Sequence, residues 1–263
     1  MRILFIGDVF GTQGRKAIKK ELPQLVKDNK IDFVIANAEN TTHGRSLSLK
    51  HYKELMDAGV NFFTFGNHTW QLDEIKEVLK QKNTVRPANL KEVAPQTKFG
   101  GVGTREVKVN GTIIKITNLL GMSIPMGDIQ ESPVKTLTKI IKETDKHDIH
   151  IVDFHCETTS EKNALFLKFA GKVSAILGTH THVQTADEKI LKNTAYITDV
   201  GMTGGSLGVI GADAEEILPV FDGTKAKFIL KPSDTPYQFS AVLLEFDKDN
   251  KTKAIHRVLK YEQ

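Results

Sequence analysis

Short apolar runs alternate with amphipathic stretches through the first 80 residues of the chain. Residues 2–6, 33–36 and 61–65 are mostly apolar and have the length of strands. Between them, residues 14–29, 48–58 and 71–80 are predicted helices, the first with apolar side chains at helical spacing. This alternation predicts a parallel sheet with right-handed crossovers.

From about residue 98 to 118 the pattern changes. Val107 and Val109 precede Asn110-Gly111, and further alternating apolar positions follow at Ile114 and Ile116. Asn-Gly between two alternating runs is a strong signal for a β-hairpin.

The rest of the chain again mixes helices and strands. The pattern predicts helices over 133–146, with Ser132 as cap and Pro133 at the first position, and over 160–171, capped by Ser160. It predicts strands over 150–155, 173–177, 238–246 and 252–260, the last two joined by a turn at Asp249-Asn250.

These elements favour an α/β fold of two mixed sheets packed face to face with helices outside, a four-layer α/β/β/α sandwich. Strand order is left open at this point. No Pro/Gly/Ser-rich linker or charge block divides the sequence, so we expect a single domain over residues 1–263.

Composition and charge narrow the class of protein. Of the 263 residues 40% are hydrophobic and 26% charged, and the net charge is +4 with scattered lysines. Such a small excess gives little support for a dedicated nucleic-acid surface. Cys156 is the single cysteine, so an intrachain disulfide is excluded. Without a signal-peptide core or a run long enough for a membrane span, we expect a cytoplasmic protein that does not bind membranes.

Residues suited to metal binding follow five predicted strands. Each alone is an ordinary turn or loop residue, but the carboxyl ends of strands in an open α/β sheet meet at one edge. The set consists of Asp8, Glu39-Asn40, Asn67-His68, His155, and His180 with His182.

The donor types indicate the chemistry. Carboxylate, amide oxygen and imidazole suit Mn, Fe and Zn, without the thiolates of a structural zinc site. Two divalent ions bring four positive charges, and Asp8 and Glu39 bring two negative ones, so the site keeps about +2 for an anionic phosphate. Such a centre clamps a phosphoryl group and generates the hydroxide that attacks it in line.

Three segments resemble the calcineurin-like metallophosphoesterases, with informative departures. The segments are Gly7-Asp8, Gly66-Asn67-His68 and Gly178-Thr179-His180-Thr181-His182. Phe10 replaces the histidine of the usual D-x-H motif, Glu39-Asn40 replaces the bridging Asp and the Asn, Thr69 replaces an acid, and one extra residue separates Gly178 from His180. These departures resemble a narrower branch, the YmdB-like phosphodiesterases, which are associated with cyclic nucleotides. The resemblance covers essentially the whole chain and includes His43-Gly44, Asp153-Phe154-His155, Thr159-Ser160-Glu161-Lys162 and Asp199–Gly204.

The resemblance implies an α/β/β/α sandwich and two metal ions, with Fe or Mn favoured over Zn or Mg. It implies Glu39 as a bridge between the two ions and His68 as the general acid that protonates the leaving oxygen. The implied ligand sets are Asp8, Glu39, Asn40 and His182 for one ion, and Glu39, Asn67, His155 and His180 for the other.

For the other candidate site residues, two interpretations are left open. His43 and Arg45 either contact the substrate or belong to a solvated loop, and Asp153 either orients a ligand or is an ordinary residue near a strand end. Trp70 either stacks on a nucleobase or, as we favour, packs in the core. Cys156 is not expected to be a ligand because the harder donors complete the set.

The leading functional hypothesis is a phosphodiesterase acting on small nucleotides, notably 2′,3′-cyclic ones, with 3′,5′-cyclic nucleotides as further candidates. A phosphomonoesterase or a nuclease could use the same centre, but no basic, aromatic run indicates a nucleic-acid groove. The alternative from another class is a non-catalytic RNA- or nucleotide-binding regulator. Physiological substrate, native metal, homo-oligomer formation and a nucleic-acid partner are left open.

Overall fold

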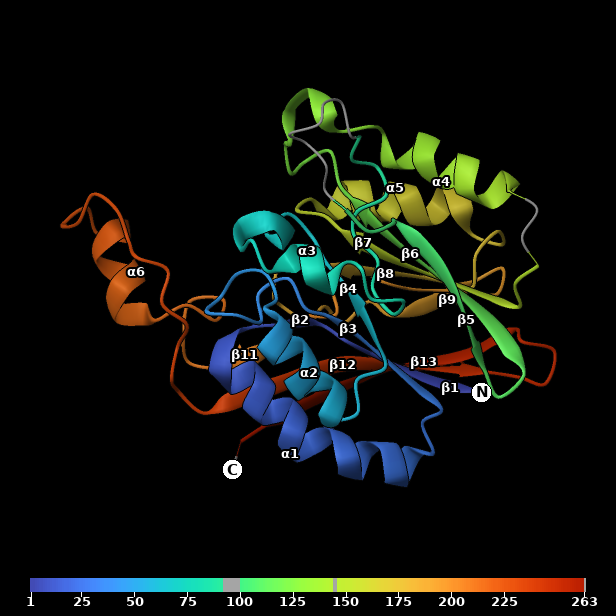
Figure 1. The fold of residues 1–263 in the computed structure, drawn as a ribbon, viewed down its shortest axis with the longest axis horizontal. Coiled ribbons are helices and arrows are strands. Elements are labelled where there is room, and N and C mark those ends of the chain that lie inside the picture. Colours follow the sequence, from blue (N-terminus) through green and yellow to red (C-terminus); the bar gives the residue numbers. More distant parts are fainter. Residues whose placement is uncertain (92–99, 144–145, 263) are drawn as a thin grey trace.

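Two mixed β-sheets lie face to face in the computed structural model, which describes residues 1–91, 100–143 and 146–262. Helices cover the outer faces (Figure 1). The sheets contain seven and six strands among these described residues. The first sheet runs β2 (Asp8–Val9), β11 (Met202–Gly205), β12 (Tyr237–Phe246), β1 (Arg2–Ile6), β3 (Phe33–Asn37) and β4 (Phe62–Thr64), with β13 (Thr252–Tyr261) paired to β12. The second runs β5 (Thr104–Val109), β6 (Thr112–Leu120), β7 (Ile149–His155), β8 (Ala175–Thr179), β10 (Thr194–Ile197) and β9 (Lys189–Leu191).

Both sheets combine parallel and antiparallel pairs, which confirms the predicted α/β/β/α sandwich. Strands β1, β3 and β4 are parallel, as the strand–helix alternation predicts, whereas β12 runs antiparallel to β1. In the second sheet β6, β7, β8 and β10 are parallel, and β5 and β9 add antiparallel edges.

The helices form the outer layers. Those packed on the first sheet are α1 (Gly11–Asn29), α2 (Leu49–Asp57) and the short α3 (Ile75–Val78). Those on the second sheet are α4 (Pro133–Lys142) and α5 (Thr159–Phe169). Helix α6 (Ala214–Phe221) extends away from the body (Figure 1). Among the residues described, no helix has the length and apolar character that a membrane span requires.

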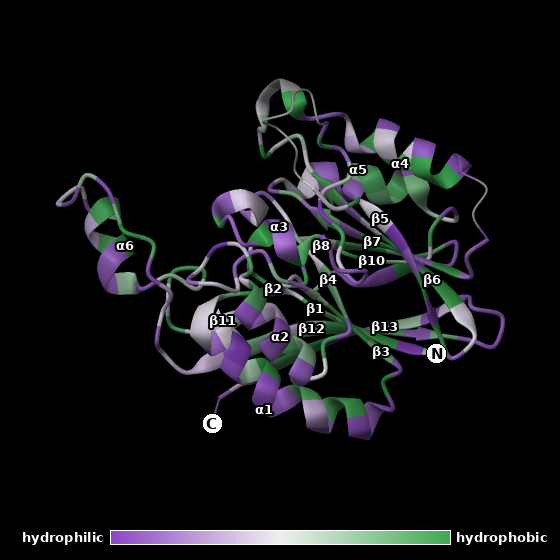
Figure 2. Cartoon of the chain, viewed as in Figure 1, coloured by the Kyte–Doolittle hydropathy of each residue, from purple (hydrophilic) through white to green (hydrophobic). Residues whose placement is uncertain are grey.

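The core follows the two-residue period of the strands. Ile3 and Phe5 of β1 join the apolar cluster between the two sheets. Leu4 and Ile6, pointing to the other face, join the cluster beneath α1 and α2. Hydropathy colouring shows the same division, with apolar residues along the strands and polar residues on the outer helices (Figure 2).

Several predicted boundaries differ from the structure. The first helix begins at Gly11, not at residue 14, because Gly11 adopts a left-handed φ of 60° that turns the chain into the helix. The helix predicted over 71–80 is reduced to α3 after a 3-10 turn, η1 (Thr69–Gln71). The backbone of His68 binds Glu39, which holds the chain ahead of α3 in a tight turn.

Of the two predicted helix caps, one is confirmed and the other is wrong. Ser132 caps α4, with its hydroxyl accepting from the Lys135 N–H at 3.4 Å. Residues 144–145 of the helix predicted over 133–146 lie outside the described part of the chain. Ser160 does not cap α5, because Thr158 occupies the extended N-cap position and Ser160 falls within the first turn.

Among the predicted strands, the hairpin is confirmed, with φ of 48° at Asn110 and 89° at Gly111, although residues 98–99 of that region lie outside the described residues. The strand predicted over 173–177 is shifted to Ala175–Thr179. Strands β9, β10 and β11 and helix α6 were not predicted from the sequence.

Candidate metal centre

Strands from both sheets bring the predicted ligands to one edge of the sandwich. Asp8 begins β2 directly after the end of β1, and Glu39 follows β3, the parallel neighbour of β1. His155 ends β7, and His180 follows its parallel neighbour β8. The two sheets therefore contribute donors from opposite sides of the same edge.

The nitrogen Nε2 of His155 lies at the centre of a tight cluster. It lies 3.0 Å from Glu39 Oε1, 3.0 Å from His180 Nδ1 and 3.1 Å from Asn67 Oδ1. Ligand atoms of Glu39, His155 and His180 all fall within 4.8 Å of one another. A ring nitrogen carries at most one hydrogen, so it cannot satisfy three neighbours as a donor. This convergence is typical of groups that share a cation.

Asp8 and Asn40 add oxygens next to this cluster. Asp8 Oδ2 accepts from the His180 N–H at 3.1 Å, and Asn40 Nδ2 donates to the Gly44 carbonyl at 3.1 Å. The remaining side-chain oxygen of each residue is buried and has no hydrogen-bond partner within the described structure. Buried polar atoms are normally satisfied, so two such oxygens beside the His155 cluster fit a cation as their partner.

The two histidines of the loop after β8 have strained backbones. His180 has φ of 101° and His182 has φ of 66°, where non-glycine residues are uncommon. His182 Nδ1 lies 2.7 Å from the Ile210 carbonyl, which assigns the ring hydrogen to Nδ1 and the lone pair to Nε2. Strain of this kind persists where the surrounding structure requires it, most often at functional sites.

Burial and charge pairing shift the pKa values of the cluster. Burial raises the pKa of Asp8. Burial also opposes ionisation of Glu39, but the adjacent His155 prevails and lowers the pKa of Glu39 to about 2. Although burial works against its charge, Glu39 raises the pKa of His155. The buried Glu39 carboxylate thus stays ionised and favours a positive charge beside it.

The residues that hydrogen-bond to the predicted ligands were harder to identify from the sequence. The Thr179 hydroxyl lies 2.9 Å from His155 Nδ1 and donates to Asp153 Oδ1 at 2.8 Å. Asn37 donates to the other Asp153 oxygen at 3.0 Å. Asp153 therefore orients His155 through Thr179, the role that sequence analysis left open. The only sequence signal for Thr179 and Asn37 was their position at predicted strand ends.

Further contacts hold the side chains of His68 and His180, which both lie in loops at this edge. The His68 N–H donates to Glu39 Oε2 at 2.9 Å, and His68 Nδ1 lies 2.7 Å from Gln71 Nε2. His180 Nε2 lies 2.9 Å from Glu157 Oε2, on the side of the ring away from the cluster. The sequence pattern gave no signal for Glu157, whose partner His180 follows a different strand, or for Gln71, which contacts His68 across the turn of η1.

The remaining candidates lie around this centre. Phe10, which replaces the usual histidine, packs its ring edge against His182 with centroids 5.5 Å apart. Cys156 is buried and bonded to Ser123 at 3.3 Å, apart from the ligand atoms. Trp70 packs against two apolar clusters. His43 is exposed and Arg45 half-buried in the turn after Asn40, and their role in substrate binding stays a prediction.

Comparison with known proteins gives close relatives over nearly the whole chain. A protein of Mycoplasma pneumoniae named as a phosphatase/phosphodiesterase is 46% identical over 95% of this chain and 89% of its own length. The 2′,3′-cyclic-nucleotide 2′-phosphodiesterase of Bacillus subtilis is 42% identical over 98% of this chain and 97% of its own length.

A solved structure agrees with the fold. The crystal structure of a novel phosphatase from Mycoplasma pneumoniae superposes with a TM-score of 0.94 at 43% identity, covering 100% of this chain and 94% of that one. The family model described as YmdB-like protein matches residues 4–258. This chain therefore belongs to the YmdB-like protein family.

Proposed function

We propose that this protein is a dinuclear metal-dependent phosphodiesterase that hydrolyses small nucleotides, above all 2′,3′-cyclic ones. The observation that carries the proposal is the convergence of Glu39, His155 and His180 beside two buried oxygens that lack partners. The names of the relatives support the reaction class, and the 42% identical Bacillus subtilis protein supports the substrate class.

The donors fit metal ions. Asp8 Oδ1 and Asn40 Oδ1 are buried without a hydrogen bond in the described structure, so a cation there removes an otherwise unfavourable burial. We assign Asp8, Glu39, Asn40 and His182 to one ion and Glu39, Asn67, His155 and His180 to the other. The mix of oxygen and imidazole donors, with no thiolate, favours Fe or Mn. Bound there, the metal ions supply the Lewis acidity that activates water and neutralises phosphate charge.

His68 is positioned to handle the leaving group. Its backbone is tied to Glu39 and its Nδ1 lies 2.7 Å from the amide nitrogen of Gln71. An amide N–H donating to Nδ1 selects the tautomer with the hydrogen on Nε2. We assign this Nε2–H to protonation of the ribose oxygen that leaves phosphorus, a general-acid role.

The experiment combines metal analysis with a substrate panel. The purified protein, loaded with Mn²⁺ or Fe²⁺, is assayed with a 2′,3′-cyclic nucleotide, a 3′,5′-cyclic nucleotide, a nucleoside 3′-monophosphate and a short oligonucleotide. We expect about two metal ions per chain and the highest kcat/KM on the 2′,3′-cyclic nucleotide. Metal-loaded protein that leaves both cyclic nucleotides intact would falsify the proposal. Preference for the monophosphate or the oligonucleotide would indicate a phosphomonoesterase or a nuclease instead.

A further inference from the structure

A pocket adjoins the proposed metal centre on the side of His182. It has a volume of about 250 Å³ and is lined by residues that include His182, Gln184, Met202, Ile210, Gln238 and Tyr261. His182 is thus shared between the pocket and the proposed ligand set. Ligand pockets usually measure about 300–1,000 Å³, so a space of this size suits one ring system and not a long polymer.

The pocket continues the inner face of the first sheet. Gln238 of β12 pairs with Tyr261 of β13, so their side chains lie on the same face. Val242, an even number of residues along β12 from Gln238, belongs to the core between the two sheets. The pocket is therefore the end of the inter-sheet space, where the inner face becomes open beside the metal edge.

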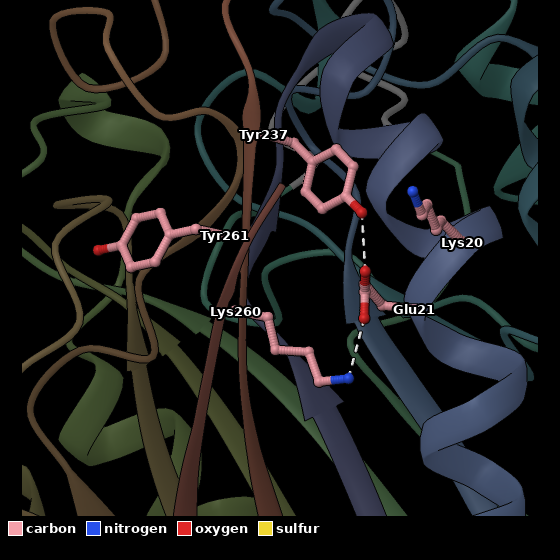
Figure 3. A pocket seen from close by; sticks show the side chains of 5 residues that line it. All are labelled: Lys20, Glu21, Tyr237, Lys260 and Tyr261. Atoms are coloured by element: carbon pink, nitrogen blue, oxygen red, sulfur yellow. Dashed lines mark hydrogen bonds and ion pairs between the residues drawn. The ribbon is translucent and has the colours of Figure 1, made fainter. Parts of the chain in front are cut away.

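Tyr261 presents an unusually exposed ring here. It is 58% exposed although it belongs to a strand, and Leu259, two residues earlier on the same face, is 45% exposed. Figure 3 shows a neighbouring pocket that Tyr261 also lines; there Tyr237 and Lys260 both donate to Glu21, and the Tyr261 ring points away from these three residues. The Tyr261 ring is thus free of that network and lines the space next to His182.

Apolar and polar groups in the pocket complement a nucleobase. Met202 and Ile210 offer apolar walls, and Tyr261 offers a ring for stacking. Gln238 Nε2 donates to the Met202 carbonyl at 3.3 Å, so its Oε1 is the atom that can accept an N–H from the edge of a base.

We propose that this pocket is the nucleobase subsite, with Tyr261 stacking on the base and Gln238 contacting its edge while the phosphate lies at the metal edge. The inference rests on the proposed phosphodiesterase function and adds a binding site to it. It explains how a phosphodiesterase distinguishes a cyclic nucleotide from other small phosphodiesters.

The test compares two substrates that differ only in the base. These are a purine nucleoside 2′,3′-cyclic phosphate and 1-O-methyl ribose 2,3-cyclic phosphate, which lacks the base. We expect Tyr261→Ala to lower kcat/KM for the nucleotide by about 5- to 150-fold, mainly through KM, and to leave the base-free substrate unchanged. Tyr261→Phe should retain nearly full activity, because stacking needs the ring and not the hydroxyl.

Phe221→Ala is the matched control, since Phe221 is 82% exposed on α6 and does not line this pocket. It should change neither substrate. Equal losses on both substrates in Tyr261→Ala, or no loss on either, would overturn the subsite.

A binding experiment distinguishes failure of this inference from failure of the proposed function. A nucleoside 3′-phosphate and ribose 3-phosphate are titrated calorimetrically into the metal-loaded protein. Tighter binding of the nucleotide that is lost in Tyr261→Ala supports the subsite even if no cyclic substrate is hydrolysed. Hydrolysis of both cyclic substrates without any effect of Tyr261 leaves the phosphodiesterase intact and refutes the subsite.

Discussion

The hydroxyl of Thr179 lies 2.9 Å from Nδ1 of His155. Because the same hydroxyl donates its hydrogen to Asp153, it can only accept from the imidazole. In the neutral form that a metal ligand must have, the ring therefore carries its hydrogen on Nδ1, and the lone pair of Nε2 faces Glu39, Asn67 and His180. One hydroxyl thus determines which nitrogen of His155 is available to a metal ion.

Replacement of Thr179 by Val should weaken metal binding without emptying the site. Valine keeps the shape of the side chain and removes the hydroxyl, so we expect metal affinity to fall by about 10- to 100-fold. Competition with a chelator measures this affinity. Thr194→Val is the control, because Thr194 is also buried and donates to the Val173 carbonyl at the N-terminal ends of the parallel strands β8 and β10, opposite the end that carries His180. Its stability should fall while its metal affinity stays that of the wild type.

Glu39→Ala should lose metal and activity together. The buried Glu39 carboxylate contacts both His155 and the backbone of His68, and we assign it to both ions. Elemental analysis and turnover are measured on the same samples. Cys156→Ala should keep near-normal metal content, because Cys156 is bonded to Ser123 and not to the ligands. Full metal occupancy in Glu39→Ala would contradict the bridging role.

His68→Ala should separate catalysis from metal binding. If His68 protonates the leaving oxygen, both metal ions stay bound and turnover of a cyclic nucleotide falls by about 10²–10⁴-fold. A ribose hydroxyl is a poor leaving group and needs that proton, whereas nitrophenolate needs little help. The loss should therefore be small on an aryl phosphodiester. Equal losses on both substrates would indicate stabilisation of the phosphoryl oxygens, and metal loss would make His68 a ligand or a structural support.

Lys162→Met should destabilise the fold by about 3–5 kcal/mol, because it leaves Asp199 buried without its cation. Lys162 Nζ lies 2.8 Å from Asp199 Oδ2, and both side chains are 1% exposed. Asp199 also accepts from the N–H and hydroxyl of Thr181, between the two loop histidines. Urea unfolding measures the change.

A surface pair provides the comparison for Lys162. Lys80 and Glu77 lie 2.6 Å apart with 67% and 58% of their side chains exposed. Lys80→Met should leave the free energy of unfolding nearly unchanged, since solvent screens exposed pairs. Similar effects for Lys80→Met and Lys162→Met would show that the buried ion pair has no special role in stability.

Stability should fall with acid partly through His150. Burial, aided by the charges of His147 and Lys115, lowers the pKa of His150 to about 3. In the unfolded chain His150 binds a proton near pH 6.5, whereas in the folded chain it stays neutral until about pH 3. The stability associated with a neutral His150 is therefore complete above pH 6.5 and is lost as the pH falls toward 3. The free energy of unfolding should decrease by up to about 1.4 kcal/mol per pH unit from this group.

His150→Gln removes that titration and keeps a polar partner for Thr117, which lies 2.8 Å from His150 Nε2. The difference in stability between wild type and variant should shrink from pH 7 to pH 4, measured by urea unfolding at each pH. Parallel stability curves over this range would exclude His150 as the titrating group.

Local patterns in the sequence were sufficient to predict the main helices and strands and the strand ends that carry the candidate metal ligands. Apolar runs and helical spacing predicted β1, α1 and β3, and Asn110-Gly111 predicted the β5–β6 hairpin. These signals are local because they depend on side-chain periodicity and turn geometry. They failed for β11, whose residues Met202–Gly205 include two glycines and form a strand through pairing with β2 and β12.

The sequence by itself determined which donors stand at strand ends, because those positions are set by the local pattern and the fold class. Only the tertiary structure decided how they meet. The register of two sheets places His155 Nε2 within about 3 Å of Glu39, a residue more than 100 positions earlier. The same packing brings Thr179 to His155 and Tyr261 toward His182. Contacts of this kind depend on the distance and direction of side chains across the fold, which no local periodicity contains.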